Sequence, residues 1–426
     1  MKQRSRLTLL VILMIAVVVV VLAVTMMRKP PDDTEKQAVD LEERLKQLRS
    51  VPYTTVTDEL VDETRSGVVA HDPDHVSPGY NIYCSRTAPE AYIMDVSGRI
   101  VHTWTYPQEK FWVWDHMIML TGGDAIIIEK YGYLLKLDWN SNLIWRRKMP
   151  VHHDVVELED GTLLVIWLGL RSHRDILTRF SAIAHLTADG GEIDKWSTYD
   201  HLDEINLKFD RRSFLDTILD SMIAAGCPPE SIDVIPGPVK TRRLRHGRTL
   251  YDYFHMNTLS ILPDTPLGRA DSRFRAGNIL TCLRNVNQIA VLDRDTKEIL
   301  WVWGEGVLEW PHHPTLLANG NILIFDNGVY RKYTRVIEVD PLTEAIEWEY
   351  KGDPPESFYS YGKGSAQRLP NGNTLICDGD NGRAIEVTND GRIVWEWLNP
   401  ATEEGHRVQV YRMMRLPPEA VDPLLP

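Results

Sequence analysis

The sequence is poor in cysteine and in positive charge, and these two shortages limit the functions to be considered. Only four cysteines occur in 426 residues, and no two of them form the CxxC pair of a zinc or redox motif. The chain has 47 Lys and Arg against 60 Asp and Glu, which gives a formal net charge of −13. Because such a charge repels a phosphate backbone, we do not expect a nucleic acid partner.

Motifs for nucleotides and for glycosylation are also absent. The chain contains neither GxxxxGK[ST] nor GxGxxG, the two loops that cradle phosphates. We therefore expect no nucleotide cofactor. No N-x-[ST] glycosylation site occurs either, which favours a bacterial envelope over a eukaryotic secretory pathway.

Three of the cysteines occupy equivalent places in a repeat. Cys84, Cys282 and Cys377 each follow a turn glycine by five residues, as Phe325 does. Equivalent places in separate repeats are far apart in space, so the pattern predicts small buried side chains rather than disulfides.

The amino terminus has the one long apolar run. It extends from Leu7 to Met27 behind Lys2, Arg4 and Arg6. It is long enough to span a bilayer, and no small-x-small cleavage site follows it. We predict a single-pass, uncleaved signal anchor in residues 1–29, with the rest of the chain on the periplasmic face of a bacterial inner membrane.

Tryptophan marks a sixfold repeat. A turn-like segment and a strand of alternating β-branched and aromatic residues precede each of Trp104, Trp145, Trp196, Trp303, Trp348 and Trp397. A Gly-led strand such as GNILTCL or GNILIFD precedes most copies, and the spacing is roughly 45–50 residues apart from one insertion. This period is typical of propeller blades, so we predict an all-β, six-bladed propeller.

The blade count also sets the domain limits. The first copy begins at Gly79 without an inner strand, and residues 411–417 supply one that closes the ring, so the propeller is expected over 79–417. Residues 30–78 are predicted to be a stalk, with a packing arm for a second subunit as the open alternative, and the oligomeric state is not set by the sequence. Residues 200–252 form an insertion at the rim, and 418–426 a short tail.

Histidines recur where the inner strands begin. They are His116, His153, His255 and His313, and the fifth copy has Ser365. Inner strands of a propeller surround its central channel, so the four imidazoles are predicted to converge there.

Arg284 stands in the same region of the fourth blade. A fixed guanidinium near neutral imidazoles suits an anionic substrate, and a neutral imidazole is a nucleophile. Two other interpretations stay open at this point: a structural histidine network and a metal site. The carboxylates of Asp115, Asp154 and Asp326 are expected to alternate to other faces of their strands, which weakens the metal interpretation.

The motifs that carry these residues resemble those of the bacterial arylsulfate sulfotransferases, over residues 79–417. They are HHDVVELEDGTLL at 152–164, DYFHMN at 252–257, LTCLRN at 280–285 and the stretch from the paired histidines at 312 and 313 to FDNG, which ends at Gly328. Members of that family are six-bladed propellers that move a sulfuryl group between phenols without a nucleotide donor. The resemblance implies an aryl sulfate donor, a phenolic acceptor, and neither a metal nor another cofactor.

The resemblance also implies roles for single residues. His313 would be the nucleophile and pass through a sulfohistidine intermediate, while His153, His255 and Arg284 would stabilise the sulfuryl oxygens. His255 would also relay the phenolic proton. His312 stands where the family often has Gln. A metal-dependent propeller hydrolase or lyase and a non-catalytic envelope scaffold remain the alternatives.

Overall fold

The structure is a computed structural model that describes residues 56–60, 65–107, 113–173, 176–208 and 250–426. The predicted signal anchor lies outside these residues, as does most of the predicted stalk. In the part of the chain that is described, no helix is long and apolar enough to cross a membrane.

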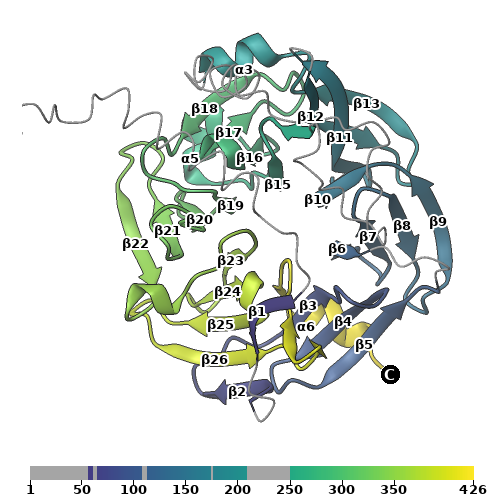
Figure 1. The fold of residues 1–426 in the computed structure, drawn as a ribbon, viewed down its shortest axis with the longest axis vertical. Coiled ribbons are helices and arrows are strands. Elements are labelled where there is room, and N and C mark those ends of the chain that lie inside the picture. Colours follow the sequence, from purple (N-terminus) through teal and green to yellow (C-terminus); the bar gives the residue numbers. More distant parts are fainter. Residues whose placement is uncertain (1–55, 61–64, 108–112, 174–175, 209–249) are drawn as a thin grey trace, which may run out of the picture. The chain divides into compact units, whose positions relative to one another are not determined.

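Six antiparallel sheets surround a central axis, which confirms the predicted six-bladed propeller (Figure 1). Blade 1 consists of β29 (Met414–Leu416), β3 (Tyr80–Cys84), β4 (Glu90–Asp95) and β5 (Ile100–Thr105). Blade 2 consists of β6 (Trp114–Met119), β7 (Ala125–Glu129), β8 (Tyr133–Leu137) and β9 (Leu143–Lys148). Blade 3 consists of β10 (Val151–Glu157), β11 (Leu163–His173), β12 (Ile176–Leu186) and β13 (Glu192–Ser197).

The remaining three blades follow in chain order. Blade 4 consists of β15 (Met256–Ile261), β16 (Ile279–Leu283), β17 (Gln288–Leu292) and β18 (Ile299–Trp303). Blade 5 consists of β19 (His312–Leu316), β20 (Ile322–Asp326), β21 (Arg335–Val339) and β22 (Ile346–Lys351). Blade 6 consists of β23 (Ser365–Arg368), β24 (Thr374–Asp378), β25 (Arg383–Val387) and β26 (Ile393–Leu398).

The repeat in the sequence corresponds to fixed places in the blades. All six marker tryptophans lie on the outermost strand of the repeat, and the Gly-led strands are second strands. Four second strands, β7, β16, β20 and β24, are buried along their whole length. Their side chains pack against those of the neighbouring blade, so the core consists of apolar clusters between blades. The free thiols of Cys84, Cys282 and Cys377 are buried there, as predicted.

The carboxyl-terminal strand closes the ring. β29 pairs with β3, with Met414 opposite Ile82 and Leu416 opposite Tyr80. Residues 418–426 are more than a loose tail: they form α6 (Pro418–Val421) and η5 (Asp422–Leu424), and Val421 is fully buried against blades 1 and 2.

Part of the predicted stalk belongs to the propeller. β2 (Gly67–His71) pairs with β26 and adds a fifth strand to blade 6. β1 (Val56–Leu60) forms a small sheet with β28 (His406–Val408) and β27 (Thr402–Glu403). The prediction of a stalk up to residue 78 was wrong for these strands, because the polar composition that suggested a stalk is equally typical of edge strands.

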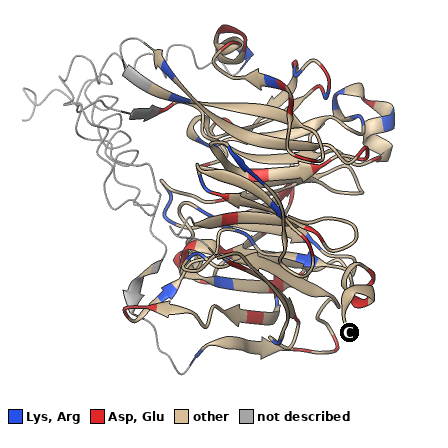
Figure 2. Ribbon diagram, turned by 90° about the vertical axis from the view of Figure 1, so that its right-hand side faces the viewer, with Lys and Arg blue, Asp and Glu red and all other residues tan. Residues whose placement is uncertain are grey.

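The insertion and the short helices complete the described chain. The insertion begins with α3 (Leu202–Lys208) and ends with β14 (Leu250–Asp252), which runs parallel to β12 of blade 3. The other helices are α5 (Pro266–Ala270), η1 (Ser272–Phe274), η2 (Arg284–Val286), η3 (Pro355–Ser357) and η4 (Gly379–Asn381). Figure 2 shows acidic and basic positions interleaved along the strands, without a continuous basic stripe.

Candidate active site

The inner strands carry the predicted site residues at the end where each strand begins. In Figure 1, β6, β10, β15, β19 and β23 are the labelled strands nearest the axis. His153, His255 and His313 all have a left-handed backbone, with φ of 64°, 53° and 46°. The strand register is irregular beside each of them. A left-handed backbone at a residue other than glycine costs on the order of 1–3 kcal/mol, and such positions cluster at functional sites.

The register differs from the expected one. Equivalent positions in the inner strands can be found by counting back from the last residue that pairs with the second strand. His313 lies three residues before this end in blade 5, at Leu316, and His116 lies three residues before it in blade 2, at Met119. In blades 3 and 4 the residues at this position are Asp154 and Thr258 instead of His153 and His255. His116 and His313 thus share one position, but His153 and His255 do not share it, because bulges within the inner strands shift which residue stands there.

Two of the predicted histidines contact each other directly. His255 Nε2 lies 3.1 Å from His153 Nε2, and His255 Nδ1 lies 2.6 Å from Asp252 Oδ2. Since the carboxylate can only accept, His255 donates from Nδ1 and has its lone pair on Nε2. His153 then donates to it from Nε2, and its own Nδ1 accepts from Nδ1 of His152. The result is a buried chain of neutral imidazoles that ends on a carboxylate.

Burial and neighbouring positive charge keep these imidazoles neutral. Burial lowers the pKa of His255 to about 4, and the positive charge of Arg284 contributes to this lowering. The negative charge of Asp252 has the opposite effect but is the smaller contribution. Burial also lowers the pKa of His153 well below its usual value. Burial raises the pKa of Asp252, but the charge of His255 and the hydrogen bond to it lower this pKa overall. Asp252 is thus a fixed anion behind His255.

Arg284 lies directly beside this chain. Its backbone N–H donates to the carbonyl of His255 at 3.2 Å, and its guanidinium lies 4.3 Å from the ring centroid of Trp310. Its Nε donates to Asn285 Oδ1 at 3.1 Å. Among the described residues, no carboxylate lies within ion-pair distance of this buried guanidinium. A buried cation without a paired anion attracts an anionic ligand.

Two hydrogen bonds hold His313 and leave its Nε2 unengaged by any described residue. Its Nδ1 donates to the carbonyl of Ala366 at 3.0 Å, and its backbone N–H donates to Thr258 Oγ1 at 3.0 Å. The hydrogen bond at Nδ1 fixes the tautomer and leaves the lone pair on Nε2. Burial lowers the pKa of His313 to about 3, with Arg412 as the next contribution.

A second polar group adjoins His313 and contains the predicted His116 together with Arg412, which was missed in the sequence. Arg412 donates to Asp154 Oδ1 at 3.0 Å, and His116 Nε2 lies 3.3 Å from the same oxygen. The ring of Tyr411 lies 5.5 Å from that of His153, so it joins this group to the imidazole chain. Asp154 had been expected to face away from the channel, which the bulge in β10 prevents.

His312 also turns toward the site. Its Nδ1 donates to Asn327 Oδ1 at 2.7 Å, so Asn327 positions a side chain as well as shaping the turn. Its Nε2 is buried and has no hydrogen-bond partner among the described residues. The charges of Arg284 and His255 both act on this imidazole.

The whole region contains more buried cations than carboxylates. The cations are Arg86, Lys130, Arg179, Arg284, Lys363 and Arg412, and the carboxylates are Asp115, Asp154, Asp252 and Asp380. Burial lowers the pKa of Lys130 to about 8, although Asp115 at 2.9 Å opposes this shift. In the described chain, no three His, Cys, Asp or Glu side chains are placed to hold one metal ion. The surplus of positive charge suits an anionic substrate.

Comparisons with known proteins agree with the motifs. The family model described as arylsulfotransferase (ASST) matches residues 116–400, and no curated protein matches the chain. A crystal structure of a protein of unknown function from Bacteroides caccae is similar at 14% identity, with 79% of this chain and 98% of that chain covered and a TM-score of 0.47. Virginiamycin B lyase from Staphylococcus aureus is similar at 8% identity, with 82% and 88% covered and a TM-score of 0.42.

Proposed function

The chain belongs to the arylsulfotransferase (ASST) family, and from this premise we propose that it transfers a sulfuryl group from an aryl sulfate to a phenol through a sulfohistidine at His313. The observation that carries the proposal is the position of the His313 side chain. Its Nδ1 is fixed on the carbonyl of Ala366, and its Nε2 has no hydrogen-bond partner among the described residues. A neutral imidazole with a free, oriented lone pair is an activated nucleophile.

The two half-reactions share one set of residues. In the first, His313 Nε2 forms a bond to sulfur, the bond from sulfur to the aryl oxygen breaks, and the electron pair leaves with that oxygen. Arg284 stabilises the sulfuryl oxygens, where negative charge persists, and His153 adds a hydrogen bond when its Nε2–H turns from His255 to the substrate. In the second, the acceptor oxygen attacks sulfur and releases His313.

His255 handles the phenolic proton in both half-reactions. Once the Nε2–H of His153 has turned to the substrate, Nε2 of His255 takes the proton from the acceptor as that oxygen attacks, and it gives this proton to the leaving oxygen of the next donor. A bound sulfate ester opposes the charge of Arg284 and thereby raises the pKa of His255 toward its usual value. Asp252 at 2.6 Å stabilises the imidazolium that forms.

The direct test of this function is an assay with 4-nitrophenyl sulfate. We expect release of 4-nitrophenol that depends on an added phenol, together with formation of the corresponding phenyl sulfate. Release at the same rate without any phenol would show hydrolysis instead, and no release would favour the non-catalytic scaffold.

The activity is expected to persist at acidic pH. Because burial and then Arg412 lower the pKa of His313 to about 3, the neutral nucleophile should dominate down to about pH 4. We expect kcat/KM for 4-nitrophenyl sulfate to stay level from pH 7 to pH 5, since its leaving group needs no proton. With an ordinary histidine pKa near 6.5, the rate would fall about thirtyfold over this range. A half-loss near pH 6.5 would contradict the assigned environment of His313.

Asp252 is proposed as the positioning residue of His255. In Asp252→Asn, the amide can donate to Nδ1 and reverse the tautomer, a change that costs up to about 10⁴-fold in a serine protease triad. We expect a large loss of kcat with phenyl sulfate, whose leaving oxygen needs a proton, and a much smaller loss with 4-nitrophenyl sulfate. Equal losses with both donors would indicate a merely structural role.

We also propose that the enzyme is anchored at the periplasmic face of an inner membrane. The basis is the apolar run from Leu7 to Met27 and the basic residues before it. Fractionation should place the protein in the membrane fraction, with the propeller accessible to protease from the periplasmic side.

A further inference from the structure

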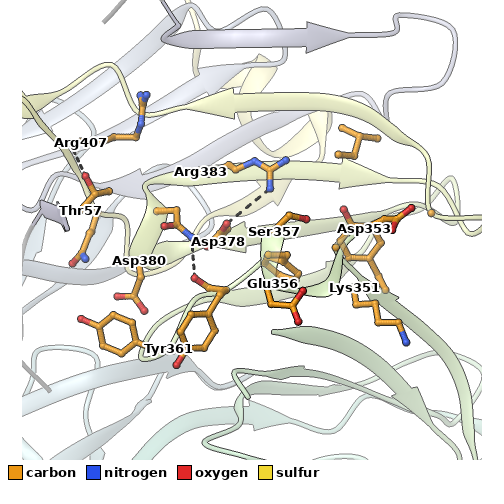
Figure 3. Close-up of a pocket in the computed structure, with 18 residues that line it drawn as sticks. Thr57, Lys351, Asp353, Glu356, Ser357, Tyr361, Asp378, Asp380, Arg383 and Arg407 are labelled. Carbon is orange, nitrogen blue, oxygen red and sulfur yellow. Dashed lines mark hydrogen bonds and ion pairs between the residues drawn. The ribbon is translucent and has the colours of Figure 1, made fainter. Parts of the chain in front are cut away.

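A cleft of about 820 Å³ opens between blades 5 and 6, apart from the histidines (Figure 3). One wall is the connection from β22 to β23, and the other is formed by η4 and the strands beside it. Thr57 of β1 and Gln409 also line it. The cleft is large enough for a small organic molecule.

The cations that line the cleft are already engaged. Arg383 donates to Glu396 Oε1 at 2.6 Å, and Lys351 donates to Glu349 Oε2 at 2.8 Å. Arg407 donates to the carbonyl of Asn399 at 2.7 Å. Arg383 and Lys351 are thus compensated by carboxylates, whereas the guanidinium of Arg407 contacts only carbonyls among the described residues and keeps its positive charge.

The carboxylates of the cleft are less well compensated. Asp353 and Glu356 are exposed, and neither has an ion pair or side-chain hydrogen bond with any described residue. Asp378 is buried, and its nearest cation, Arg383, is 3.9 Å away; burial raises the pKa of this carboxyl to about 6, so Asp378 adds less negative charge than the two exposed carboxylates do. Only Asp380 has a close cation, Lys363 at 2.6 Å. The charge that a ligand would meet in the cleft is negative.

Four aromatic residues also line the cleft. They are Tyr350, Phe358, Tyr359 and Tyr361. The faces of such rings carry partial negative charge and attract ammonium groups, so they add to the effect of the carboxylates. Carboxylates at the mouth and aromatic rings in the walls together suit an organic cation.

The cleft adjoins the segment that positions the nucleophile. Tyr361 lines the cleft, and Lys363, two residues later, forms an ion pair with Asp380 of the cleft. The carbonyl of Ala366, three residues further along, accepts the hydrogen bond from His313 Nδ1. The charges of Arg86 and Asp115 act on Lys363. Four residues, 362–365, stand between Tyr361 of the cleft and Ala366, whose carbonyl holds the reacting imidazole.

We propose that this cleft binds the ammonium end of the acceptor, so that the enzyme prefers phenols with a cationic side arm to phenols with an anionic one. This inference rests on the proposed function, because it assigns a substrate class to the same transfer reaction. Asp353 and Glu356 meet the ammonium group, and the tyrosines contact the arm that leads to the phenol in the channel.

The test compares two acceptors of equal length and opposite charge, 4-(6-aminohexyl)phenol and 6-(4-hydroxyphenyl)hexanoate, with 4-nitrophenyl sulfate as donor. We expect kcat/KM to favour the amine by about tenfold or more, as a few weak charge and cation–π contacts allow. The double variant Asp353→Asn/Glu356→Gln should bring the ratio of the two acceptors close to one. Calorimetry with the amine alone, without donor, should show weaker binding to the same variant.

A matched control removes two exposed carboxylates elsewhere, in Glu298→Gln/Glu344→Gln, which changes the net charge equally. If this control lowers the ratio as much as the cleft variant does, the preference is a long-range effect of net charge and the inference is overturned. A wild-type ratio near one also overturns it. If unsubstituted phenol accepts no sulfuryl group at all, it is the proposed function that fails.

Discussion

His313→Ala is expected to reduce sulfuryl transfer about 10⁴- to 10⁶-fold, as loss of a covalent nucleophile does in other enzymes. The reason is the state of its two ring nitrogens, which His153, His255 and His312 do not share. His255 Nε2 accepts from His153, and His312 Nε2 is fully buried, whereas His313 combines an oriented Nδ1–H with an unengaged Nε2. The measurement is kcat/KM with 4-nitrophenyl sulfate and phenol.

Two further variants separate chemistry from folding. His313→Asn keeps a side chain that tolerates the left-handed backbone and can still donate to Ala366, so its thermal stability should stay near that of the wild type while transfer is lost. His71→Ala removes an exposed histidine from β2 and should keep full activity. Near-normal transfer by either His313 variant would exclude the proposed nucleophile.

Arg284→Met is expected to have the second-largest effect. The guanidinium is buried and lacks a paired carboxylate in the described chain, so its charge is available to the sulfuryl oxygens. Removing one such stabilising group costs on the order of 2.7–4 kcal/mol, or about 10²- to 10³-fold in kcat. Methionine keeps the apolar packing against Trp310, so the loss should be in catalysis rather than in stability.

The control for this variant is Arg275→Met, which removes an exposed cation from the connection between β15 and β16. We expect no change in kcat and only a small change in the salt dependence of KM. If Arg284→Met lowers the rate less than tenfold, the sulfuryl oxygens are stabilised elsewhere, and Arg412 would be the first candidate.

The fold could be predicted because the sequence repeat consists of residue types that are typical of strands and turns. A tryptophan on each outermost strand and a glycine before each second strand recur in all parts of the ring, and both follow from local rules of turns and alternation. Closure by β29 followed from a count of strands, because the first repeat lacked the inner strand that the other repeats have.

The site could be predicted only in part, because bulges change which side chains face the channel. His153 and His255 were expected at the same strand position as His313, but they lie at other positions. Their positive φ angles change the direction of their side chains, which therefore still face the channel. Asp154 was expected to face away for the same reason. A bulge depends on pairing with the neighbouring strand, which no local pattern in the sequence specifies.

Arg412 could have been found. The sequence already assigned residues 411–417 to the inner strand of blade 1, and side chains at the beginning of inner strands were expected to face the channel. The same argument that selected the histidines therefore applied to Tyr411 and Arg412. The ion pair of Arg412 with Asp154, by contrast, joins residues 258 positions apart and is visible only in the folded chain.

The most direct test of the account is a search for the covalent intermediate. The wild-type enzyme would be mixed with 4-nitrophenyl sulfate without an acceptor, quenched at high pH to preserve a labile N–S bond, digested and analysed by mass spectrometry. The account predicts the mass of one added sulfuryl group on the peptide that contains His313, lost again when phenol is added before quenching. An active enzyme that carries the group on another residue, or on none, would contradict it.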